Sequence, residues 1–167
     1  IKIRNEANSI FKNISSDIID SSIEKHRQLD FLVLDRKIEQ ISSLTLTSAQ
    51  SIRVLTKVDT TLHTSLQPNA LSIMTLILSM HQKFKTALDD FHHNKANIMS
   101  HYHELLELKT QVESKHMDSL EIIYLLGNQD KIKIGTFRST ESFFDSLKTL
   151  AYAIESACST LEWLVIN

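Results

Sequence analysis

Histidine is the residue type in this sequence most able to do chemistry, and the chain holds 8 copies. His92, His93, His101 and His103 crowd one short stretch, but no pair of them has the four-residue spacing with which one helix offers two ligands to zinc. His81, His92 and His103 share a helix face, but successive members lie roughly 16 Å apart. We expect no metal or other cofactor within one chain, so only a site shared across a dimer interface stays open. We interpret the histidines as surface or seam residues that change charge between about pH 5 and 8.

The other reactive side chains do not form a recognisable catalytic site. The carboxylates are spread over polar faces and lack the paired, cleft-like setting of general acid and base catalysis. Di-iron bundles need a Glu-x-x-His pair on each of two helices, and the sequence has one, Glu113 with His116. Gly127 and Gly135 stand alone, so there is no glycine-rich phosphate loop. We expect a protein that is not an enzyme and has no small-molecule substrate.

Composition limits the class of protein further. The chain has 167 residues, 42% of them hydrophobic, and carries 18 Lys and Arg against 20 Asp and Glu. These values fit one domain with a sizeable core and give no basic surface for nucleic acid. Cys158, the single cysteine, is expected to be a small core residue. No apolar run reaches the 18 or so residues that a membrane span needs. The chain begins at Ile1, so we expect it to be part of a longer protein, and we expect a cytoplasmic location.

Helices are the predicted elements because the chain has only 2 glycines and 1 proline, too few for sheets or a loop-rich fold. From Ala70 to Leu126, apolar residues recur in alternating steps of four and three. This pattern predicts one long helix over residues 69–126, packed against another helix as in a coiled coil. Five positions of the step are polar: His81, Lys95, Lys109, His116 and Ser119.

Two further helices complete the predicted fold. A long helix covers residues 3–66, either continuous or broken in the polar stretch 20–28, and Pro68 ends it because proline lacks the backbone N–H. A loop over residues 127–139 leads to a last helix, 140–166, whose stripe is apolar at every position. We therefore predict an all-α fold: an elongated antiparallel helical bundle, or coiled-coil-like rod, with two long helices and a shorter third helix folded back on one end.

These lengths leave residues 40–96 as a two-helix arm without a third helix to shield it. In this arm Met74 and Ile77 serve the seam between the helices, while other apolar side chains lie on a second face. A helix that is apolar on more than one side is buried on more than one side. The sequence therefore predicts a surface for self-association or for a protein partner at Leu71, Ile73, Leu76, Leu78 and Met80.

The function predicted from this surface is that of a non-catalytic scaffold or adaptor, which dimerises or docks a protein partner. Two alternatives stay open. One is a curvature-binding helical dimer at a membrane surface, which the near-neutral charge and scattered lysines disfavour. The other is a ligand-sensing bundle of a receptor, in which the polar seam residues Thr45, Ser48 and Asp59 would line a small pocket.

Overall fold

The computed structural model describes residues 2–57 and 62–166, and this part of the chain is helical with no β-strand. The prediction of an all-α fold is confirmed. Five α-helices and one short 3-10 helix follow one another along the chain: α1 (Lys2–Asp20), α2 (Lys25–Lys57), η1 (Thr64–Leu66), α3 (Gln67–His93), α4 (Ala96–Asn128) and α5 (Ile134–Ile166).

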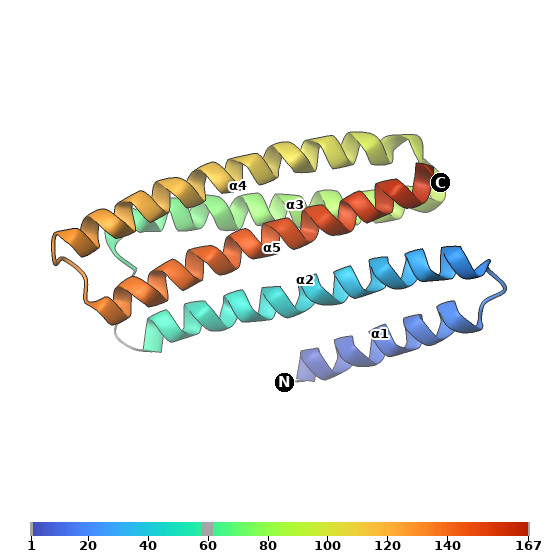
Figure 1. Cartoon of the computed structure of the whole chain (residues 1–167), viewed down its shortest axis with the longest axis horizontal. Helices are drawn as coiled ribbons and strands as arrows, with labels where there is room; N and C mark the ends of the chain where they lie inside the picture. The colour runs from blue at the N-terminus through green and yellow to red at the C-terminus, as the bar shows by residue number, and fades with distance from the viewer. Residues whose placement is uncertain (1, 58–61, 167) are drawn as a thin grey trace.

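The four long helices α2 to α5 lie side by side, and each runs opposite to the one before it (Figure 1). Helix α5 packs against α2, α3 and α4, and α3 packs against α4. Helix α1 folds back outside α2, and within the described part of the chain α2 is the one helix it packs against. In the described residues, no Cα atom of α2 comes within 8 Å of one in α3. The sides of α2 and α3 that face each other are therefore held apart.

The apolar stripes predicted from the sequence form the core. Every residue of the last helix's predicted stripe is buried, and so is Cys158. The stripe residues of α5 are Phe143, Leu147, Leu150, Ile154, Ala157, Leu161 and Leu164. All the buried residues of α4, from Ile98 to Leu126, also belong to the stepped pattern. Burial of a whole side chain of this kind contributes about 1.5–3 kcal/mol, so these rows fix how the helices face each other.

The prediction of one unbroken helix over residues 69–126 is wrong. The chain leaves helical geometry at Asn94, where φ is −150° and ψ is 75°, and α4 then returns alongside α3. The stepped pattern continues across this break because each half carries its own apolar stripe in the same phase. Folding back lets the two stripes bury each other, which a single straight helix cannot do.

The predicted two-helix arm is also wrong. Helix α5 begins at Ile134 instead of residue 140 and has 33 residues, as many as α2 or α4, so the third helix is not a short one. The predicted helix 3–66 is broken between Asp20 and Lys25, the second of the two alternatives. The turn is held by Gln28, whose amide donates to the Ser21 carbonyl at 3.0 Å. The described parts of the predicted arm, residues 40–57 and 62–96, consequently lie against α5 and α4 instead of projecting alone.

Pro68 differs from its predicted role of ending a helix, and Gly127 does not form a turn. Pro68 stands in the first turn of α3, where its missing N–H leaves no intrahelical bond unmade. Gly127 remains within α4, and the positive φ of the following turn belongs to Asp130, at 54°. A Cβ atom on Gly127 would lie 3.0 Å from the Phe137 ring, so this glycine permits close packing of α4 against the start of α5.

Candidate ligand-binding groove

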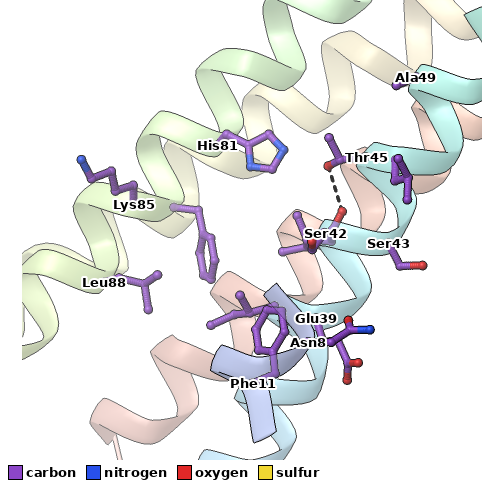
Figure 2. Close-up of a pocket in the computed structure, with 14 residues that line it drawn as sticks. Asn8, Phe11, Glu39, Ser42, Ser43, Thr45, Ala49, His81, Lys85 and Leu88 are labelled. Atoms are coloured by element: carbon purple, nitrogen blue, oxygen red, sulfur yellow. Dashed lines mark hydrogen bonds between the residues drawn. The ribbon is translucent and has the colours of Figure 1, made fainter. Parts of the chain in front are cut away.

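An open cavity of about 680 Å³ lies between α2 and α3, with one end under α1 (Figure 2). Its size falls within the usual range for small-molecule sites, about 300–1,000 Å³. The apolar lining comes from all three helices: Phe11, Ile38, Ile41, Leu46, Ala49, Phe84 and Leu88. The polar lining residues are Asn8, Glu39, Ser42, Ser43, Thr45, His81 and Lys85. A mainly apolar cavity with a few polar groups is the usual composition of a ligand site.

The groove exists because α2 and α3 are each held by a different neighbour. The buried residues of α2 include Leu34, Ile41, Ser48 and Leu55, a row spaced by seven, and α2 packs mainly against α5. Helix α3 is held mainly by α4. A T-shaped contact between the Phe31 and Phe91 rings, 6.1 Å between centroids, joins α2 to α3 just beyond one end of the groove.

His81 is the polar side chain that points into the groove from α3, toward α2 (Figure 2). Burial lowers the pKa of His81 below its ordinary value of 6.5, so the ring is uncharged at neutral pH. A neutral imidazole has one N–H donor and one acceptor nitrogen. Within the described part of the chain, neither ring nitrogen of His81 has a hydrogen-bond partner. The Thr45 hydroxyl, in contrast, already donates to the Ile41 carbonyl at 2.8 Å.

The pocket residues of the receptor alternative are only partly brought together. Thr45 lines the groove. Ser48 is buried on α2, its hydroxyl has no hydrogen-bond partner among the described residues, and it does not line the groove. Asp59 lies outside the described residues. Most of the lining could not be predicted from the sequence, because the groove depends on where α1 and α3 lie beside α2, which no local pattern specifies. One usable signal was His81, a polar residue at a seam position.

The predicted docking residues divide between two faces of α3. Ile73 and Met80 are fully buried, and Leu76 is half-buried against the core. Leu71 and Leu78 remain outside, with 64% and 58% of their surface exposed. The five residues therefore do not form one surface, because α4 and α5 cover the face that the predicted arm would have left open.

The histidines singled out by the sequence form separate pairs. His101 contacts Asp90 at 2.8 Å, and His116 contacts Asp145 at the same distance. The His103 ring nitrogen donates to the Met99 carbonyl. In the described residues no three His, Cys, Asp or Glu side chains are grouped so that they could hold a metal ion.

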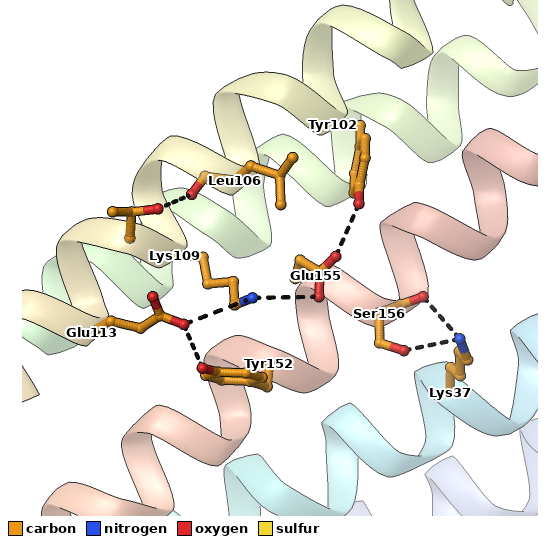
Figure 3. Close-up of polar contacts among 9 residues, drawn as sticks. Lys37, Tyr102, Leu106, Lys109, Glu113, Tyr152, Glu155 and Ser156 are labelled. Carbon is orange, nitrogen blue, oxygen red and sulfur yellow. Dashed lines mark hydrogen bonds and ion pairs between the residues drawn. The ribbon is translucent and has the colours of Figure 1, made fainter.

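A cluster of polar side chains lies between α4 and α5 (Figure 3). The Tyr102 hydroxyl donates to Glu155 at 3.1 Å, and the Tyr152 hydroxyl donates to Glu113. Lys109 lies between the two carboxylates, 3.7 Å from Glu113 and 4.0 Å from Glu155. Burial raises the pKa of Tyr102, and the bond to Glu113 raises the pKa of Tyr152, so both hydroxyls keep their protons. Each member has a partner within the cluster, which suits a role in aligning the two helices.

Cys158, the one thiol, is not a nucleophile. Its side chain is buried, and burial raises its pKa to about 12. The reactive form of cysteine is the thiolate, which this environment suppresses.

Comparison with known proteins finds no matching family, no matching curated protein and no matching solved structure. No helix in the described part of the chain combines the length and the apolar character needed to cross a membrane.

Proposed function

We propose that this chain is a non-catalytic helical bundle that binds an elongated, mainly apolar small molecule in the groove between α2 and α3. The observation that carries the proposal is the cavity of about 680 Å³ with its apolar floor. This proposal follows the ligand-sensing alternative. Of the residues predicted to line its pocket, Thr45 lines the groove and Ser48 does not. The elongated, coiled-coil-like form is part of the proposal, and the seven-residue row along α2 supports it.

A non-catalytic role is supported by the groove's ionisable groups. His81 and Lys85 lie on α3, Glu39 lies on α2, and no hydrogen bond or ion pair joins any of the three to another. Nucleophilic and acid–base mechanisms need such groups within hydrogen-bonding reach of each other or of the reacting atom. Binding through shape and apolar contact makes no such demand.

The proposal is tested with a neutral apolar probe, N-phenyl-1-naphthylamine, whose fluorescence rises when it leaves water. Thr45→Trp places a large ring in the groove, and we expect it to weaken probe binding at least about tenfold, the effect of losing about 1.4 kcal/mol. Thr47→Trp is the matched control, because Thr47 is also an exposed residue of α2 that donates to the carbonyl four residues back, but it lies outside the groove. Equal binding by both variants would contradict the proposal.

A second candidate function, self-association or docking of a protein partner, is favoured by what remains of the predicted surface. Leu71, Met74 and Leu78 are spaced three and four apart, so they form one exposed stripe along α3. Their exposed fractions are 64%, 36% and 58%. Three side chains make a small contact, so this surface supports weak and reversible association.

A further inference from the structure

The two ends of the groove carry different polar groups. Helices α2 and α3 run antiparallel, so His81 lies across from Thr45 and Ala49, whereas Leu88 and Phe11 lie together at the other end (Figure 2). The lining extends from residue 38 to residue 49 of α2, about 16 Å at the rise of an α-helix. A ligand that fits this groove is therefore long, with different chemistry at its two ends.

The charged residues of the lining are also divided between the two sides of the groove. Lys85 follows His81 by one helical turn on α3, so both nitrogen bases belong to one wall. Glu39 stands on α2 at the other end, beside Asn8 of α1 (Figure 2). Among the side chains that the structure describes, α1 adds no charged group to this lining, and α4 and α5 add no residue to it. An anionic group is attracted to the His81 wall and repelled from the Glu39 end.

Resting on the proposed function, we propose that the ligand is an amphipathic long-chain monocarboxylic acid. Its carboxylate accepts a hydrogen bond from the His81 imidazole, and its chain lies along Phe84 and Leu88 toward Phe11.

Two physical features favour a carboxylate over an uncharged head group. His81 is a half-buried imidazole without a hydrogen-bond partner in the described residues, and a charge-assisted bond to a carboxylate is about twice as strong as a neutral one. Burial lowers the pKa of His81 in the free protein, and a bound carboxylate would raise it again by favouring the charged ring. Carboxylate binding therefore takes up a proton. The affinity for the carboxylate must fall as pH rises through the pKa of His81 in the complex.

The experiment is a calorimetric titration with dodecanoate and with dodecanol, which has the same chain and an uncharged head. The wild-type protein is expected to bind dodecanoate roughly tenfold tighter at about pH 6 than at about pH 8, because the charged imidazole that a carboxylate favours is lost as pH rises. Dodecanol is expected to bind equally at both pH values.

His81→Gln should remove the pH dependence and weaken dodecanoate binding about tenfold at the lower pH. His103→Gln, at an exposed position outside the groove, should behave as wild type.

The results separate this inference from the function on which it rests. If dodecanoate and dodecanol bind equally well and without pH dependence, the groove holds apolar ligands and the carboxylate assignment is overturned. If neither they nor N-phenyl-1-naphthylamine bind, the proposed function fails and the assignment fails with it. The wild-type pH profile decides the matter even if His81→Gln folds poorly.

Discussion

The two glycines show how the surroundings of a residue decide the effect of one methyl group. Glycine within a helix costs about 1 kcal/mol relative to alanine. At Gly135, near the start of α5, an added Cβ meets nothing within 4 Å, so Gly135→Ala should raise the free energy of unfolding by about 0.5–1 kcal/mol. At Gly127 the Cβ would lie 3.0 Å from the Phe137 ring, and crowding of this kind costs about 1–3 kcal/mol.

We therefore expect Gly127→Ala to be less stable than Gly135→Ala by about 1–3 kcal/mol, in spite of the same gain in helix propensity. Urea unfolding followed by circular dichroism measures both variants against the wild type. Equal stabilisation by the two substitutions would show that the Phe137 ring moves aside without cost.

The polar positions of the stepped pattern show what the sequence could reveal at this scale. The pattern identified His81, Lys95, Lys109, His116 and Ser119 as exceptions within an apolar seam. Each has a distinct role in the fold: His81 lines the groove, Lys95 stands at the start of α4, and Lys109 belongs to the polar cluster between α4 and α5. The buried His116 contacts the exposed Asp145, and the buried Ser119 hydroxyl donates to the Lys115 carbonyl. The sequence marked these places but not their partners, since the partners lie on helices distant in sequence.

At the scale of the elements, the turn between α3 and α4 is tied by Asp90. This carboxylate accepts hydrogen bonds from the His101 ring at 2.8 Å and from the Asn97 amide at 3.2 Å. The hydrogen bonds from His101 and then Asn97 lower the pKa of Asp90. A lowered pKa means that Asp90 contributes stability above its unfolded-state pKa, and that this contribution is lost as pH falls through the folded-state value.

We expect Asp90→Ala to lower the melting temperature at about pH 7, and the difference from wild type to shrink as pH falls below about 4. Asp89→Ala is the control, because Asp89 is an exposed neighbour on the same helix. Calorimetric scans across this range provide the measurement. A deficit of Asp90→Ala that stays the same at low pH would mean that the charged form of Asp90 does not hold the turn.

This turn also explains why two helices were predicted as one. Helix breaks are usually read from glycine or proline, and the segment from His92 to Ala96 contains neither. The bonds that hold the turn come from Asn97 and His101 on the returning helix, so they exist only after the chain has folded back. The break before Lys25 was easier to anticipate because the stretch 20–28 is almost entirely polar.

At the scale of the whole molecule, helix content could be predicted and helix arrangement could not. The scarcity of glycine and proline and the apolar stripe of α5 were sufficient to predict the all-α fold and much of the core. The choice between a rod with a bare arm and four helices side by side depends on the total apolar surface buried. That quantity favours the folded-back arrangement, because a two-helix arm leaves one side of each stripe in water.

This arrangement changes how the predicted association surface must be tested. Met80 is fully buried, so Met80→Glu would place a charge in the core and report on stability instead of association. The informative variant is Leu71→Glu with Leu78→Glu, two exposed positions two helical turns apart on α3. Met117→Glu with Leu125→Glu is the matched control, because these residues are 55% and 56% exposed on α4 and the change in charge is the same.

If the stripe of Leu71, Met74 and Leu78 joins two copies, the wild-type mass measured by light scattering should fall on dilution. The Leu71→Glu and Leu78→Glu variant should associate more than tenfold less tightly, because burial of each leucine contributes about 1.5–3 kcal/mol and about 1.4 kcal/mol is a factor of ten. The α4 control should keep the wild-type dilution curve. A wild-type chain that stays monomeric at every concentration would exclude self-association through this stripe, and a groove ligand would then be the better explanation of the molecule.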